Sequence, residues 1–137
     1  MDRRERIEET LRRAARVASP RRIRVVVGQP LVAAIRRELA AWKGVGTLVE
    51  PAALNTGPAC LYAARWIGER DPDATLLVLP SDHFVAGMAG FRRSVQRARR
   101  LAEKGLLVTF GIPPEVASTE YGYILRGVPL GNLGHRV

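Results

Sequence analysis

The chain of 137 residues is long enough for one domain with a single core, and 47% hydrophobic and 26% charged residues are typical of an ordinary globular protein. No apolar run reaches the ~18 residues that a membrane span needs, and the charged start is unlike a signal peptide. We therefore expect a cytoplasmic protein with no membrane partner. The single cysteine, Cys60, excludes a disulfide framework and a cysteine-based metal site.

The net charge of +9 raises the question of nucleic-acid binding. Of the 22 basic residues only Lys43 and Lys104 are lysine, and nine arginines lie within the first 24 residues, mostly on the expected solvated face of a helix. Aromatic residues do not interleave with these arginines, so there is no platform on which bases could stack. We expect no nucleic-acid partner, whereas attraction of an anionic nucleotide or sugar phosphate stays open.

Hydrophobic periodicity predicts helices that alternate with short apolar runs typical of strands. Alternation of this kind indicates an α/β fold with a mainly parallel sheet and right-handed crossovers. The predicted helices cover about 4–18, 32–42, 59–66 and 91–102, and the predicted strands cover 22–28, 47–49, 75–79, 106–110 and 121–125.

The run 75–79 (TLLVL) has no polar alternation, which predicts a strand buried on both faces at the centre of the sheet. Ser81, Asp82 and His83 follow it directly. Because ligands of open α/β sheets bind beyond the carboxyl ends of the strands, Asp82 is a candidate ligand for a divalent cation that carries phosphates. The alternative is that Asp82 only caps the next segment.

Three stretches together resemble the sugar-nucleotidyltransferases, specifically the mannose-1-phosphate guanylyltransferases (GDP-mannose pyrophosphorylases). Residues 50–59 (EPAALNTGPA) are similar to the pattern E-P-x-x-R-N-T-A-P-A, and residues 79–83 (LPSDH) match L-P-S-D-H. Residues 110–113 (FGIP) and 119–124 (TEYGYI) are similar to F-G-I-x-P and T-G-Y-G-Y-I. The resemblance covers roughly residues 4–127 and implies a Rossmann-like nucleotidyltransferase domain.

The resemblance also implies an activity, in which GMP is transferred from GTP to mannose-1-phosphate and pyrophosphate is released. Asp82 would be the catalytic residue and would bind the Mg²⁺ that bridges the phosphates. Tyr121, Gly122 and Tyr123 would contact the sugar, although the two tyrosines could instead alternate and pack on a strand. The nucleotide-binding residues would be Glu50, Asn55, Thr56, Gly57, Pro58 and Ala59.

Within this loop, Asn55 and Thr56 also fit a helix N-cap ahead of Pro58, and both interpretations can hold at once. His83 is expected to make a structural hydrogen bond, because the family's reaction needs no histidine base.

The family's glycine-rich loop, G-x-G-x-R-L-x-P-L, is not found among these residues. Gly44-Val45-Gly46 precedes a predicted strand, so we interpret it as a turn. Two further departures are Ala53-Leu54, where the family has a small residue and an arginine, and Glu120, which replaces a glycine. We thus expect residues 1–137 to form one partial domain, truncated at both ends, with a poorly anchored tail from about residue 127.

Three hypotheses follow. The first is a portion of a guanylyltransferase that is inactive alone without the triphosphate loop. The second is a non-catalytic module that binds nucleotide-sugars or a partner, such as another chain that supplies a missing strand. The third, an unrelated flavodoxin-like domain, is disfavoured by the coincidence of three motifs.

Overall fold

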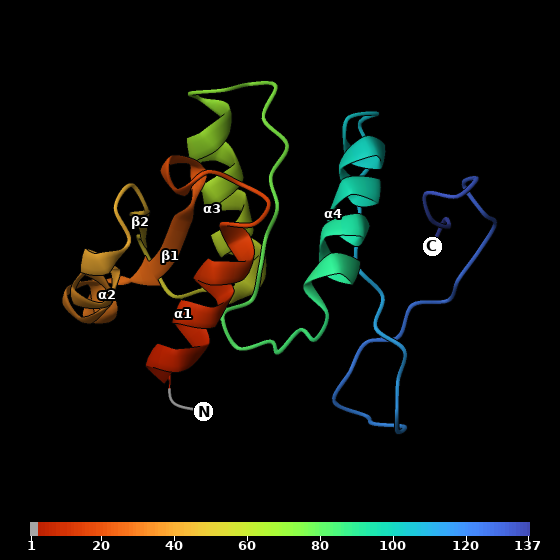
Figure 1. Ribbon diagram of the computed structural model, residues 1–137, viewed down its shortest axis with the longest axis horizontal. Helices are drawn as coiled ribbons and strands as arrows, with labels where there is room; N and C mark the ends of the chain where they lie inside the picture. The colour runs from red at the N-terminus through yellow and green to blue at the C-terminus, as the bar shows by residue number, and fades with distance from the viewer. Residues whose placement is uncertain (1–2) are drawn as a thin grey trace. The chain divides into compact units, whose positions relative to one another are not determined.

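The computed structural model describes residues 3–137 and divides into two compact units (Figure 1). The first unit ends at Ala86, and the second runs from Gly87 to Val137. In the described part of the chain no helix is both long and apolar enough to cross a membrane.

The first unit contains a parallel pair of strands, β1 (Arg24–Gly28) and β2 (Gly46–Glu50). Val26 of β1 pairs with Leu48 of β2, and the two strands end together at Gly28 and Glu50. Parallel strands need a crossover, which here consists of α2 (Val32–Glu38) between two short 3₁₀ turns. The predicted parallel α/β arrangement is confirmed for this part of the chain, as is the turn at Gly44, whose φ is +95°.

Three helices surround the two strands: α1 (Arg3–Ala14), α2 and α3 (Thr56–Gly68) (Figure 1). Apolar residues spaced four apart on a helix, such as Ile7 and Leu11 of α1, project to the same side. They pack with apolar residues of β1 and α2 into one core. The core cluster consists of Ile7, Leu11, Ile23, Val27, Ile35 and Leu39. Leu48 of β2 and Ala63 of α3 are also buried.

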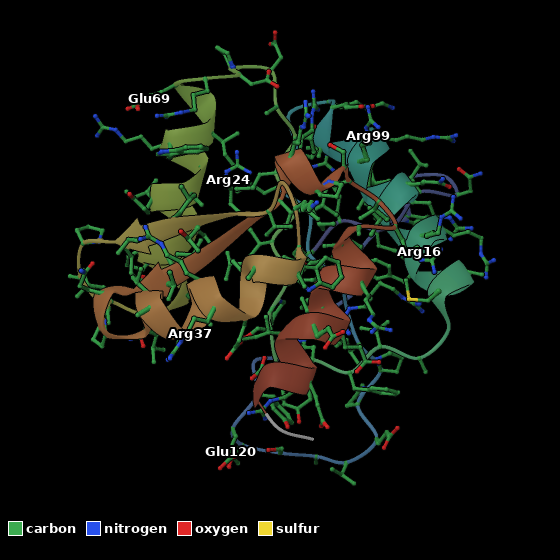
Figure 2. All side chains as sticks on the ribbon, turned by 60° about the vertical axis from the view of Figure 1, so that its left-hand side comes forward. Arg16, Arg24, Arg37, Glu69, Arg99 and Glu120 are labelled. Carbon is green, nitrogen blue, oxygen red and sulfur yellow. The ribbon has the colours of Figure 1, made fainter. Side chains whose placement is uncertain are left out.

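Cation–π contacts join α3 to β1. The Arg24 guanidinium, which Figure 2 shows beside α3, lies 5.4 Å from the centroid of the Trp66 ring. Arg70 lies 3.8 Å from the same centroid. Trp66 therefore contacts two guanidinium groups. Each cation–π pair of this kind stabilises the fold by roughly 0.5–1 kcal/mol when it is exposed.

The second unit contains α4 (Met88–Ala102), which begins after Gly87 at a φ of +77°. The tail that we predicted to be poorly anchored folds back on itself. The Gly127 N–H donates to the Arg136 carbonyl (2.8 Å), and the Arg136 N–H donates to the Val128 carbonyl (2.9 Å). These bonds flank an antiparallel bridge between Pro129 and His135.

Three predicted strands, at 75–79, 106–110 and 121–125, are wrong for this structure: these runs belong to no strand of the described chain. The run 75–79 is not buried on both faces either, since Leu76 is 38% and Val78 48% exposed. An apolar run expresses a preference for burial, but a strand exists only through hydrogen bonds to a neighbour. β1 and β2 pair with each other, and the other runs have no such neighbour among the described residues.

Candidate functional site

The carboxyl ends of β1 and β2 form the base of a candidate site. Gly28 and Glu50 are register partners at these ends. The Glu50 Oε1 lies 3.5 Å from the position that a Cβ on Gly28 would occupy, so the absence of a side chain at Gly28 leaves room for this carboxylate. In parallel α/β sheets this edge is where ligands bind.

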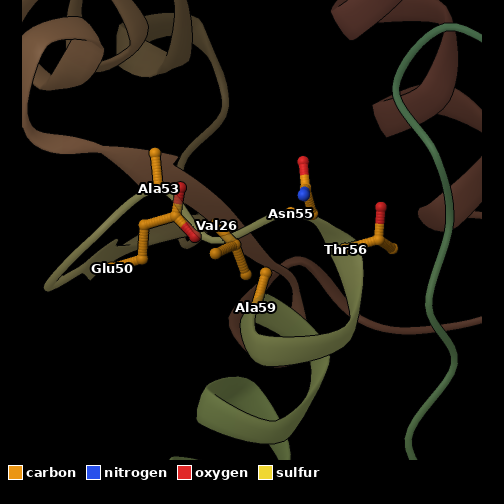
Figure 3. A pocket seen from close by; sticks show the side chains of 6 residues that line it. All are labelled: Val26, Glu50, Ala53, Asn55, Thr56 and Ala59. Carbon is orange, nitrogen blue, oxygen red and sulfur yellow. The ribbon is translucent and has the colours of Figure 1, made fainter.

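A pocket of about 400 Å³ opens at this edge (Figure 3). Figure 3 shows the Glu50 carboxylate and the Ala59 methyl group directed toward Val26, whereas the Thr56 side chain points away from them. The residues that line the pocket are Val26, Glu50, Ala53, Asn55, Thr56 and Ala59. Four of the six residues predicted to bind the nucleotide thus surround one cavity.

Val26 and Ala53 line the pocket although neither was predicted to bind the nucleotide. Val26 belongs to β1, and only the pairing of β1 with β2 brings it to the residues after Glu50. Of the remaining predicted residues, Gly57 and Pro58 lie in the first turn of α3 and are not among the lining residues. Pro58 costs no hydrogen bond there, because the first amides of a helix have no intrahelical acceptor.

Asn55 has the one positive φ among the described non-glycine residues, with φ 68° and ψ −173°. This region of backbone conformation is occupied almost only by glycine and costs about 1–3 kcal/mol for other residues. Asn55 occupies the predicted N-cap position of α3, but its side chain makes no capping hydrogen bond. Strained backbone of this kind concentrates at ligand-binding positions.

Asp82 does not line this pocket. It lies in a turn with Ser81, directly after residues 75–80, and is exposed, as are Ser81 and His83. The structure shows no capping role for Asp82, because the next helix, α4, begins after Gly87.

Two α1 side chains hold the backbone on both sides of Asp82. Arg13 Nη1 donates to the His83 carbonyl at 2.7 Å, and Thr10 Oγ1 donates to the Ser81 carbonyl at 3.3 Å. Arg13 Nη2 also donates to Thr10 Oγ1 at 2.8 Å. Sequence reasoning missed both residues, because they flank the apolar face of α1 and nothing local connects them to positions about 70 residues away. His83 takes part in a structural hydrogen bond through its backbone carbonyl.

The predicted sugar-binding residues Tyr121, Gly122 and Tyr123 belong to the second unit and are exposed. The Tyr123 hydroxyl accepts a hydrogen bond from the Ser118 N–H (2.7 Å) and donates to the Ser118 carbonyl (2.9 Å). It therefore closes the loop between residues 118 and 123. The alternative of tyrosines alternating on a strand is not realised, since residues 121–125 form no strand.

Comparison with known proteins gives relatives named as mannose-1-phosphate guanylyltransferases or as a xanthan biosynthesis protein. A putative mannose-1-phosphate guanylyltransferase of Vibrio cholerae is 46% identical over 80 residues, which are 58% of this chain and 17% of the relative. The xanthan biosynthesis protein XanB of Xanthomonas campestris is 48% identical over 84 residues, 61% of this chain and 18% of the relative. The mannose-1-phosphate guanylyltransferase of Escherichia coli K12 is 46% identical over 82 residues, 58% of this chain and 17% of the relative.

The chain spans less than a fifth of the length of these curated relatives. No solved structure gives a significant match. The sequence profile of the family described as Nucleotidyl transferase matches residues 3–134, which are nearly the whole chain. The resemblance seen in the three motifs is thus confirmed, and the chain belongs to the nucleotidyl transferase family.

Proposed function

We propose that this chain forms the base-binding part of a mannose-1-phosphate guanylyltransferase, an enzyme that transfers GMP from GTP to mannose-1-phosphate. The observation that carries the proposal is the pocket at the carboxyl ends of β1 and β2, which gathers Glu50, Asn55 and Ala59. Relatives named for this activity are 46% identical to the chain, which supports the choice of substrates.

Guanine is recognised by groups that match its hydrogen-bonding edge. This edge carries the N1–H and N2–H₂ donors at positions where adenine has no donor, and a carboxylate accepts such bonds well. Glu50 supplies that carboxylate, and the Asn55 amide supplies a donor for the guanine carbonyl oxygen. The small side chains of Ala53 and Ala59 leave space for the flat base.

In the proposed reaction a phosphate oxygen of mannose-1-phosphate attacks the α-phosphorus of GTP. A new phosphorus–oxygen bond forms while the bond to the bridging oxygen of the β-phosphate breaks, and pyrophosphate leaves with the electron pair. Positioning and charge neutralisation dominate reactions of this type. The contribution of this chain is to orient the nucleotide through the pocket and to place one carboxylate near the phosphates.

Asp82 fits the role of a single Mg²⁺ ligand. Among residues 3–137 no group of three or more His, Cys, Asp or Glu side chains could form a complete metal site. Mg²⁺ on nucleotides needs no such site, because one or two carboxylates, water and the phosphates themselves complete its octahedron. The exposed Asp82 suits such a partial site, and Mg²⁺ bound there would neutralise phosphate charge.

For the sugar we propose contacts with Tyr121 and Gly122. Nothing lies within 4 Å of a Cβ built on Gly122, so this backbone is open to approach by a ligand. Tyr123 has a supporting role in the proposal, because its hydroxyl is occupied by Ser118.

We further propose that the 137-residue polypeptide needs a glycine-rich triphosphate loop supplied from elsewhere. Gly44 and Gly46 do not provide it, since Gly44 lies in a turn and Gly46 is the first residue of β2. A non-catalytic module that binds a nucleotide-sugar or a partner is the second candidate. It is favoured by the exposed apolar side chains of the second unit, such as Leu107 and Leu125.

Calorimetric titration of the chain with GTP and ATP tests the base pocket. We expect GTP to bind more tightly than ATP, and Glu50→Gln to reduce this preference about tenfold or more, as expected for a hydrogen bond to a charged group. Glu69→Gln, at the far end of α3, is the matched control and should change neither affinity. Equal binding of GTP and ATP, or no binding at millimolar concentration, would refute the pocket assignment.

A further inference from the structure

The segment that carries Asp82 lacks the support that a sheet would provide. Among the described residues, 75–86 belong to no helix or strand, and the local structure assigned to them is a turn at Ser81 and Asp82. Yet the segment runs beside α1 (Figure 1), and two α1 side chains donate hydrogen bonds to the backbone carbonyls of Ser81 and His83, the two neighbours of Asp82. These side chains are therefore direct polar anchors of the segment to α1.

We propose that Thr10 and Arg13 are positioning residues that hold the Asp82 segment against α1 and present its carboxylate to solvent and ligand. The role of Asp82 as a Mg²⁺ ligand rests on the proposed function, whereas the restraint on the segment does not.

The geometry of Arg13 favours positioning. Its side chain is only 4% exposed, although it carries a full charge. The 2.7 Å bond to the His83 carbonyl is charge-assisted and short, and such bonds are about twice as strong as neutral ones. Its acceptors in the structure are a backbone carbonyl and a hydroxyl, and its Nε has no hydrogen-bond partner. Burial of an incompletely paired cation such as Arg13 contributes little to the net free energy of folding. We therefore infer that the Arg13 hydrogen bonds act mainly by fixing the position of the Asp82 segment.

Thr10 completes the arrangement as a relay. Its hydroxyl oxygen accepts from Arg13 Nη2, which orients the hydroxyl hydrogen toward the Ser81 carbonyl. Two carbonyls that flank one residue are thus tied to two positions one helical turn apart. The two bonds limit the backbone torsions between the Ser81 and His83 carbonyls, and thereby the direction of the Asp82 Cα–Cβ bond.

Limited proteolysis with chymotrypsin tests the restraint on the full 137-residue chain. Phe84 is 70% exposed and follows the clamped residues, so its cleavage rate reports opening of the segment. Arg13→Met removes both hydrogen bonds and keeps an apolar stem of similar length. We expect cleavage after Phe84 to accelerate about tenfold or more, measured by mass spectrometry relative to cleavage after Phe110.

Arg12→Met is the matched control. Arg12 is the neighbouring arginine, exposed and paired with Glu8 at 2.7 Å, and its loss should leave cleavage after Phe84 unchanged. If Arg13→Met unfolds the chain, which circular dichroism would reveal, Thr10→Val removes one anchor isosterically and should accelerate cleavage several-fold. Cleavage after Phe84 at the parent rate in a folded Arg13 or Thr10 variant would overturn the proposal.

A second measurement separates the restraint from the metal role. Mn²⁺ titration by electron paramagnetic resonance, in the presence of GTP, should show several-fold weaker binding in Arg13→Met. Asp82→Asn should weaken Mn²⁺ binding at least as much, with cleavage after Phe84 unchanged. If Asp82→Asn leaves Mn²⁺ affinity intact, the proposed metal role fails, and cleavage alone decides whether α1 restrains the segment.

Discussion

The two units differ in how they bury their apolar side chains. The first holds the whole core cluster, with Leu48 only 3% exposed. In the second the one buried apolar residue among those described is Leu101, and Leu107 is 103% exposed. Exposed apolar surface of this kind marks a site of interaction with other chain segments. The comparison indicates that the first unit has a packed apolar core, whereas the second leaves most of its large apolar side chains exposed.

The largest effect that would sharpen this comparison concerns activity. We expect the purified 137-residue chain to show no turnover of GTP with mannose-1-phosphate in a pyrophosphate-release assay, because loss of even one preorganised donor costs about 10²–10³ in rate. A segment with the glycine-rich loop and its strand should be necessary for turnover, and so should a second metal carboxylate supplied from elsewhere. Turnover by the chain alone that disappears in Asp82→Ala would contradict this prediction.

The next largest effect is on the free energy of unfolding, and it is tested by the same type of substitution, leucine to alanine, made once in each unit. Leu48→Ala removes a buried side chain of β2 and should lower the free energy of unfolding by about 2–5 kcal/mol. Leu107→Ala alters a fully exposed side chain and should change it by less than about 0.5 kcal/mol. Urea unfolding followed by circular dichroism measures both variants. Equal losses would show that Leu107 is buried in solution and that the second unit is covered.

The same comparison explains how much of the fold could be predicted from sequence. The Val25–Val27 run and the Leu106–Phe110 run have the same apolar, strand-like character. The first became β1 because β2 pairs with it, and the second has no partner in the described chain. Helices were predicted well because their hydrogen bonds are local, whereas strand formation depends on residues distant in sequence.

The site shows the same division. The motif at 50–59 predicted residues that do surround one pocket, since they are contiguous and follow a strand. The backbone conformation of Asn55 could not be predicted, because Asn also fits an ordinary N-cap. Nor could Arg13, since its acceptor, the His83 carbonyl, lies 70 residues away and a carbonyl has no sequence signature.

A third, smaller effect concerns the strain in the packed unit. Asn55→Gly places in the strained position the residue that adopts it most easily, and should stabilise the chain by about 1 kcal/mol after the larger entropy of unfolded glycine is included. Asn55→Ala retains the Cβ and the strain, and should not stabilise. Both variants lose the amide and should bind GTP more weakly. Thermal unfolding and GTP titration separate strain from ligand contact, and a destabilised Asn55→Gly would contradict the strain argument.

The smallest expected change in stability belongs to Asp82. An aspartate that caps a helix costs about 1 kcal/mol on truncation, but Asp82 is exposed and does not precede a helix directly. Asp82→Asn and Asp82→Ala should therefore change the free energy of unfolding by less than about 0.5 kcal/mol.

If Asp82 contacts Mg²⁺, both variants should still weaken Mg²⁺-dependent GTP binding, because the amide and the methyl group lack the charge that a hard cation prefers. Thermal unfolding with and without Mg²⁺ and GTP measures both quantities on one sample. A large loss of stability without ligand would show that Asp82 stabilises the fold instead of binding metal. Asp73, which is also exposed and lies outside the helices and strands, is the control: its replacement should change neither quantity.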